Sequence, residues 1–260
     1  MKRLRWLTIA AVTVMAAISF IVLADIFNGT PGDDNITAGA GNDVVKGFAG
    51  DDVLNGAGGN DLIDGGEDDD MITGEDGNDK IHGGNGNDII SGDITSGRLG
   101  NDTISGGRGD DMIDGGVGND RIEGGSGDDT LVGGADNDYI NGGAGDDTID
   151  GGAGNDTLLG GSGDDQITGG DGDDTIDAGQ GLDQIDAGAG NDTIIIRPGD
   201  VPGFQTEIVM CGAGTDRVLL AGFPRGIQLP TSTNLPVTIT DPWSRGTYLI
   251  DATCETIARR

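Results

Sequence analysis

The feature that most constrains this chain is a nine-residue repeat that runs from Gly29 to Ile195. One unit reads GGAGDDTID over residues 142–150, and the next reads GGAGNDTLL over residues 151–159. Seven contiguous units fill residues 29–91 and eleven fill residues 97–195, so eighteen units share one register, broken only by residues 92–96. A fixed short period of this kind is typical of a solenoid, in which each repeat packs on its neighbours.

Two positions of the unit never vary in character. The eighth residue is aliphatic in all eighteen units, from Ile36 and Val45 to Ile194, and the sixth is always aspartate. These aspartates are Asp34, Asp43, Asp52, Asp61, Asp70, Asp79, Asp88, Asp102, Asp111, Asp120, Asp129, Asp138, Asp147, Asp156, Asp165, Asp174, Asp183 and Asp192.

Each unit predicts one short strand and one turn. Positions seven to nine read x-aliphatic-x, the period-two pattern that directs one side chain inward and its neighbours outward. Positions one to six carry glycine with Asp or Asn, residues that accept positive φ in tight reversals. Two units then close one coil, and stacked coils form a flattened roll of two parallel sheets.

Stacking creates an electrostatic problem that a cation would solve. Carboxylates on neighbouring coils would lie about 4.8 Å apart, where like charges repel by about 3 kcal/mol at an effective dielectric constant of 20. The chain has 46 acidic and 14 basic residues and a net charge of −32, which excludes nucleic acid and anionic membranes as electrostatic partners. Calcium suits turns that offer carboxylate and backbone carbonyl oxygens. Because successive turns lie on opposite edges, eighteen turns minus two leaves at most sixteen interlayer sites.

The units resemble the GGxGxDxUx nonapeptides of the RTX (haemolysin-type) calcium-binding family. The resemblance implies an all-β fold, a right-handed parallel β-roll filled with calcium, in an extracellular protein. It also implies that the eighteen sixth-position aspartates are ligands. Units that depart from the pattern are expected to bind more weakly; the departures are Asp68 and Asp136 at position four, Leu182 at position five, and Ala38, Ala178 and Ala187 at position one.

Residues 1–24 precede the predicted roll of residues 25–195. Three basic residues come before an apolar run from Trp6 to Ala24, which predicts a secretory signal cleaved after Ala24. The alternative is an uncleaved anchor, because nineteen mostly apolar residues could just span a bilayer. Export agrees with the predicted metal, since extracellular calcium modules work at about 10⁻⁴ to 10⁻³ M. We therefore expect a secreted or extracellular protein, with a cell-surface location as a variant and no membrane contact after cleavage.

Residues 196–260 predict a small C-terminal β cap, since a solenoid needs an end that covers its last apolar layer. Residues 211–218 form a degenerate nineteenth unit, which makes Asp216 a further metal ligand in the prediction. Residues 208–210, 237–240 and 247–250 read as strands. The aromatic residues expected to cover the roll are Phe204, Phe223, Trp243 and Tyr248.

Both cysteines, Cys211 and Cys254, lie in the predicted cap. An even count in an exported chain favours a disulfide, which would close a loop of more than forty residues. Two reduced, buried thiols are the alternative.

The sequence offers no catalytic constellation. His82 is the only histidine and occupies an outward position, which excludes a zinc site built on histidines. Acidic pairs are frequent, but the sixth-position aspartates already belong to turns, and no break in the period forms a cleft. We expect a non-enzymatic, calcium-binding repeat protein with a structural, surface or adhesive role. The alternative is an accessory calcium-binding module of a secreted enzyme or toxin system, with a cell-surface polysaccharide or another protein as partner.

Two features outside the repeat rule leave alternatives open. Residues 92–96 predict a loop that bulges from one edge of the roll. Outward apolar residues near the start indicate a contact patch, covered either by the C-terminal segment or by a second chain. These residues are Val44, Val53, Leu62, Met71 and Ile89.

Overall fold

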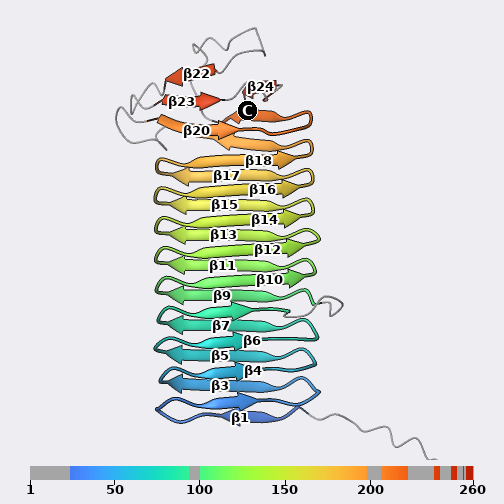
Figure 1. Ribbon diagram of the computed structural model, residues 1–260, viewed down its shortest axis with the longest axis vertical. Helices are drawn as coiled ribbons and strands as arrows, with labels where there is room; N and C mark the ends of the chain where they lie inside the picture. Colours follow the sequence, from blue (N-terminus) through green and yellow to red (C-terminus); the bar gives the residue numbers. More distant parts are fainter. Residues whose placement is uncertain are drawn as a thin grey trace, which may run out of the picture.

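In the computed structural model the described residues are 24–93, 100–197, 206–221, 237–240, 247–250, 254 and 256–259. They form an all-β roll in which the chain alternates between two facing sheets, strand by strand (Figure 1). The predicted signal or anchor segment, apart from Ala24, lies outside the described residues. Nowhere in the described part of the chain is there a helix that could cross a membrane.

The first sheet contains the odd-numbered strands of the roll. In spatial order it comprises β1 (Ile26–Asn28), β3 (Val44–Ala49), β5 (Leu62–Glu67), β7 (Lys80–Asn85), β9 (Thr103–Arg108), β11 (Arg121–Ser126), β13 (Tyr139–Ala144), β15 (Thr157–Ser162), β17 (Thr175–Gln180), β19 (Thr193–Ile196), β21 (Arg217–Leu220) and β24 (Thr256–Arg259).

The second sheet contains the even-numbered strands. It comprises β2 (Asn35–Thr37), β4 (Val53–Asn55), β6 (Met71–Thr73), β8 (Ile89–Ser91), β10 (Met112–Val117), β12 (Thr130–Ala135), β14 (Thr148–Ala153), β16 (Gln166–Asp171), β18 (Gln184–Ala189), β20 (Thr206–Met210), β23 (Thr247–Ile250) and β22 (Val237–Thr240). These strands pair in parallel, except that β22 runs antiparallel to β23.

The register confirms that two units close one coil. Leu131 pairs with Ile149, eighteen residues later, and the same offset recurs along both sheets. Across the interruption Ile90 pairs with Ile113, an offset of 23, which is eighteen plus the five extra residues. The five extra residues therefore do not shift the register of the second sheet.

The core is one side chain wide. The eighth-position residues from Val45 to Ile194 are 0–3% exposed and form a single column of aliphatic side chains between the sheets. Ile36, in the first coil, is only partly buried because no complete coil covers it from below.

The predicted strand length was wrong for most of the roll. Strands β3, β5, β7 and β9 to β18 have six residues and continue through positions one to three, which the glycine content had assigned to the turn. The ladder continues because glycine stacks on glycine, as in the pair Gly134 and Gly152, while a positive φ of 113° at Gly134 starts the bend. The three-residue length holds for β1, β2, β4, β6 and β8.

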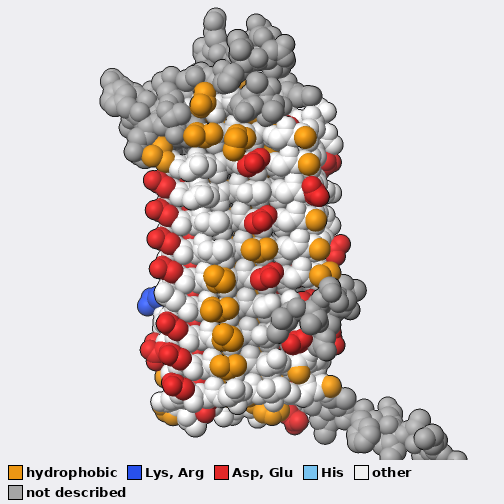
Figure 2. Space-filling view, viewed as in Figure 1, with side chains coloured by type: hydrophobic (Ala, Val, Ile, Leu, Met, Phe, Trp, Pro, Cys, Tyr) orange, Lys and Arg blue, Asp and Glu red, His pale blue; other side chains and the backbone are white. Residues whose placement is uncertain are grey.

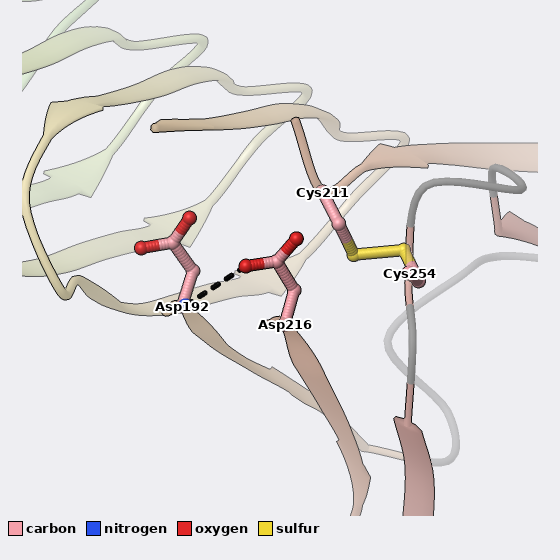
Figure 3. The surroundings of a disulfide bond; sticks show 4 residues. All are labelled: Asp192, Cys211, Asp216 and Cys254. Carbon is pink, nitrogen blue, oxygen red and sulfur yellow. Dashed lines mark hydrogen bonds between the residues drawn. A yellow bond between two sulfur atoms is a disulfide. The ribbon is translucent and has the colours of Figure 1, made fainter. Parts of the chain in front are cut away.

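The C-terminal cap extends both sheets at one end of the roll (Figure 1). Strands β22 and β23 match the predicted ranges, whereas β24 was not anticipated. Tyr248 is fully buried and its hydroxyl donates a hydrogen bond to the carbonyl oxygen of Arg197 at 2.7 Å. The other three predicted covering aromatics, Phe204, Phe223 and Trp243, lie outside the described residues. Cys211 and Cys254 form the expected disulfide, with their Cα atoms 5.0 Å apart (Figure 3).

The predicted apolar patch is divided between two faces. Val53, Met71 and Ile89 lie on the second sheet, where Met112 joins them in one row of paired residues that are 40–56% exposed. This row is visible on the face shown in Figure 2. Val44 and Leu62 belong to the first sheet, because consecutive units alternate between sheets. The described cap strands add to the end of the roll, so they do not cover either group.

Candidate metal sites between stacked turns

The predicted ligand aspartates line the interior of the turns. Seventeen of the eighteen, from Asp43 to Asp192, are 0–3% exposed, and Asp34 in the first coil is partly buried. Asp216 in the degenerate unit is fully buried. Aspartate is almost never buried without a compensating partner, so a carboxylate inside every turn requires one.

The two oxygens of each buried carboxylate have different environments. Oδ1 accepts a hydrogen bond from the backbone N–H of the aspartate one coil earlier; Asp129 N–H, for example, donates to Asp147 Oδ1 at 2.9 Å. The same bond recurs from coil to coil on both edges, as between Asp156 N–H and Asp174 Oδ1 at 2.8 Å. Oδ2 is buried and has no hydrogen-bond partner in any sixth-position aspartate from Asp52 to Asp192. A buried acceptor left in this state is costly unless a cation satisfies it.

In units that open with glycine, a backbone oxygen faces the same space as Oδ2. A Cβ placed on Gly151 would lie 2.6 Å from Asp156 Oδ2 and 2.5 Å from the carbonyl oxygen of Gly169, one coil later. The first-position glycine therefore leaves room in which a carboxylate and a carbonyl oxygen converge. No group of three or more His, Cys, Asp or Glu side chains that could hold a metal occurs among the described residues. Ligands must then include backbone carbonyls, which is the all-oxygen set that calcium prefers.

Burial raises the pKa of most of these aspartates. The pKa reaches about 8 for Asp102, Asp138 and Asp165, and about 7 for Asp147. For Asp147 burial is the main cause; the N–H of Asp129 opposes it, and the charges of Asp129, Asp128 and Asp146 add to it. A buried carboxylate of this kind needs either a proton or a cation near neutral pH, so calcium binding would displace protons.

A second row of side chains, at position five, lies outside the buried row. The Asp and Asn side chains of this row accept the N–H of the fifth-position residue one coil later; Asp146 N–H donates to Asp128 Oδ1 at 2.8 Å, and Asn155 N–H donates to Asn137 Oδ1 at 2.7 Å. The sequence pattern had indicated only a turn-forming role for position five. The signal for this second row was the recurrence of Asp or Asn one residue before the invariant aspartate.

Asp93 is a further buried carboxylate that the sequence analysis did not identify. It lies in the interruption, is 7% exposed, and its charge contributes to raising the pKa of Asp79, Asp102 and Asp120. The first residues of the interruption therefore belong to the roll, and residues 94–99 lie outside the described part.

The departures from the repeat are accommodated in different ways. Asp68 and Asp136 take positive φ angles of 78° and 77°, which aspartate tolerates better than most residues. Ala178 and Ala187 place a buried methyl group where other units leave space beside the carboxylate. In the degenerate unit Cys211 takes that position, and Asp216 Oδ1 accepts the N–H of Asp192 at 3.1 Å (Figure 3).

The outer face of the first sheet carries a different kind of surface. A groove of about 330 Å³ is lined by Lys46, Lys80 and Arg121 together with His82 and the exposed Leu62. Lys46 pairs with Asp64 at 3.7 Å, and Arg121 pairs with Glu123 and lies 4.3 Å above the ring of Tyr139. Asp64 and Glu123 also line the groove, so three Lys or Arg side chains face two acidic ones. The single histidine is thus an exposed residue of a weakly basic groove.

Comparison with protein-family models gives one match. The RTX calcium-binding nonapeptide repeat (4 copies) matches residues 28–63, 64–95, 96–131, 123–158 and 159–194, which together span well over half of the chain. No curated protein is significantly similar to the chain.

Proposed function

Because the chain belongs to the RTX calcium-binding nonapeptide repeat family, we propose that it is an exported, non-enzymatic protein whose folding is driven by calcium between stacked turns. Its role would be structural, at a surface or in adhesion. The observation that supports this proposal most strongly is the column of buried Oδ2 atoms without hydrogen-bond partners on each edge.

The residues present fit calcium without further assumptions. An ion beside Asp156 Oδ2 and the carbonyl oxygen of Gly169 would join two successive coils of the same edge. It would also neutralise the mutual repulsion of carboxylates such as Asp138, Asp156 and Asp174, which follow one another along that edge. Binding that occurs only in the folded roll stabilises it by mass action, so the fold depends on calcium concentration.

Export is supported by the sequence and by the cap. The basic and apolar character of residues 1–24 predicts a signal segment. The Cys211–Cys254 disulfide agrees with an oxidising compartment. Extracellular calcium is also abundant enough to fill weak sites.

A non-enzymatic role is supported by the chemistry of the chain. Its only histidine lies on an outer strand face and both of its cysteines are joined in the disulfide. The buried carboxylates are evenly distributed along the roll rather than gathered at one cleft.

The direct test is circular dichroism of the purified protein during a calcium titration. We expect sheet signal to appear with calcium, to disappear with EDTA and to respond far less to magnesium, which prefers rigid octahedral sites. A sheet signal that is complete in excess EDTA would contradict the proposal.

The basic groove supports the alternative of an accessory module for a polysaccharide-modifying system. Lys46, Lys80 and Arg121 outnumber the acidic residues Asp64 and Glu123 in the lining of the groove, on a chain whose net charge is −32, and this local excess of positive charge favours an anionic partner. Retention of the calcium-loaded protein on an immobilised acidic polysaccharide, abolished by Lys80→Glu, would favour this role. If the protein is not retained on the polysaccharide, the structural role is favoured instead.

A further inference from the structure

The two edges of the roll differ in the charge of their outer rows. The turns from the first sheet to the second form the Asp edge, and those from the second sheet to the first form the Asn edge. Fifth-position residues on the Asp edge are Asp33, Asp51, Asp69, Asn87, Asp110, Asp128, Asp146, Asp164 and Leu182. Those on the Asn edge are Asn42, Asn60, Asn78, Asn101, Asn119, Asn137, Asn155, Asp173 and Asn191. The acidic column along the left side of Figure 2 follows the Asp edge.

The contrast is most regular in the middle of the roll. Between residues 101 and 165 all four fifth-position residues are aspartate on one edge and asparagine on the other. The other charged residues at turn positions two to four of this stretch are Arg108 on the Asp edge and Asp136 on the Asn edge. The outer charge is therefore −3 on the Asp edge and −1 on the Asn edge over the same coils, counting these six charged residues.

The outer rows also differ in their hydrogen bonding. Asparagine carries its own donor, and on the Asn edge Asn137 Nδ2 donates to Asn119 Oδ1 at 3.2 Å, beside the backbone bond to the same oxygen. An ionised aspartate has no donor, so Asp128 and Asp146 are linked only through the backbone N–H of Asp146. Their carboxylates repel one another until a cation neutralises them.

The sixth-position aspartates form the inner row, where the calcium ions are proposed to bind, and the charge of the outer row acts on these sites. Asp129, Asp147 and Asp165 on the Asp edge are 0–1% exposed, and their Oδ2 atoms have no hydrogen-bond partner. Each follows directly after an outer aspartate, namely Asp128, Asp146 or Asp164. On the Asn edge the equally buried Asp120, Asp138 and Asp156 follow Asn119, Asn137 and Asn155. The inner rows are therefore alike, and the outer rows distinguish the two edges.

We propose that the roll holds two classes of calcium site, a tighter one along the Asp edge and a weaker one along the Asn edge. This inference rests on the proposed calcium-dependent folding. Affinity rises with the negative charge around a calcium site, and one additional carboxylate near each ion should tighten binding roughly threefold once salt screening is included. The Asn edge releases calcium first as the concentration falls.

The test is a calorimetric calcium titration of the full chain at constant ionic strength, with three charge variants. The edge variant combines Asp128→Asn, Asp146→Asn and Asp164→Asn. The face variant combines Asp114→Asn, Asp150→Asn and Asp186→Asn, which removes the same charge from the outer face of the second sheet. The reverse variant combines Asn119→Asp, Asn137→Asp and Asn155→Asp.

We expect two classes in the unmodified protein. The edge variant should weaken the tighter class roughly threefold or more, whereas the face variant should change it by less than about 1.5-fold. The reverse variant should raise the calcium affinity of the weaker class toward that of the tighter class. Hydrogen exchange at intermediate calcium should protect residues 142–147 before residues 151–156.

Three results would overturn the proposal: a single class in the unmodified protein, equal effects of the edge and face variants, or simultaneous protection of the two turns. Absence of any calcium binding by the unmodified protein would instead contradict the proposed function. If the reverse variant does not fold, the near-isosteric edge variant and the exchange experiment still decide the question.

Discussion

From Val45 to Ile194 the roll buries one aliphatic side chain and one aspartate in each unit, whereas the described part of the cap buries Tyr248, Leu220 and the Cys211–Cys254 disulfide beside one aspartate, Asp216. Both regions use parallel strands in the same two sheets. They differ in what holds successive layers together. In the roll, a narrow core is combined with carboxylates that repel one another, and the proposed calcium ions would supply the cohesion. In the cap, larger apolar side chains and a covalent bond serve that purpose.

This difference shows that one backbone ladder can be stabilised by two independent means. The roll should therefore respond to calcium and acidity, and the cap to reduction. The following predictions test that separation, from the largest expected effect to the smallest.

Removal of calcium should have the largest effect, and it should be concentrated in the roll. In EDTA we expect amides between Val45 and Ile194 to lose most of their protection from hydrogen exchange, because unneutralised carboxylates separate the coils. Amides of β21 and β23, beside the disulfide, should lose less. Equal loss in both regions would show that the cap has no stability of its own.

Neutralising three buried aspartates should weaken calcium binding without affecting the cap. Asp147→Asn, Asp156→Asn and Asp165→Asn together remove three charged ligands from adjacent coils, and we expect the calcium midpoint of folding to rise by about tenfold. Circular dichroism during calcium titration measures the shift. The matched control is the face variant at Asp114, Asp150 and Asp186, and the same shift in both variants would contradict a ligand role for the buried residues.

Removing the disulfide should have the opposite distribution. Cys211→Ala with Cys254→Ala frees a closed loop of 43 residues and should cost about 2–4 kcal/mol of cap stability at saturating calcium. Hydrogen exchange of β21 and β23 should report this loss, while β10 to β16 remain protected. Faster exchange throughout the roll would show that the cap is required to hold the coils together.

Acidity should have the smallest effect, and its sign should depend on calcium. Burial raises the pKa of Asp102 and Asp165 to about 8, from about 3.9 in an unfolded chain. The metal-free roll therefore binds more protons than the unfolded chain between these values, so this contribution is fully present below about pH 4 and is lost as pH rises toward 8.

In EDTA we expect more sheet signal at pH 5 than at pH 8. In calcium the apparent affinity should instead fall at pH 5, because protons compete for the ligands. A metal-free protein with the same signal at both pH values would contradict the burial of these carboxylates.

The fold followed from the sequence wherever one physical requirement recurred in every unit. The eighth-position residues, such as Ile122 and Leu131, are all apolar, and only burial in a shared core explains that pattern. The strand length could not be obtained in the same way. Gly133 and Gly134 have poor strand propensity, and their place in the ladder depends on identical glycines stacked above and below them.

The candidate sites were predictable in position but not in detail. The invariant Asp147 indicated a ligand. The different environments of its two oxygens could not be predicted, because Oδ1 accepts an N–H from the preceding coil and Oδ2 has no hydrogen-bond partner. Asp93 was missed because it stands outside the repeat, so no periodic signal marks it. The difference between the edges was already visible in the alternation of Asp146 and Asn155, but it acquires meaning only when a coil is known to contain two units.

The eighteen-residue coil also limits how such a chain can lengthen by duplication. Insertion of a single nine-residue unit after residue 141 would move every later turn to the opposite side of the roll, so Asp146 would stack above Asn137 instead of Asp128. Duplication of two units keeps each later turn on its own side. The five additional residues after Ser91 preserve the same arrangement, because Ile90 still pairs with Ile113 in the second sheet. Growth by pairs of units is therefore the step that preserves the identity of each edge.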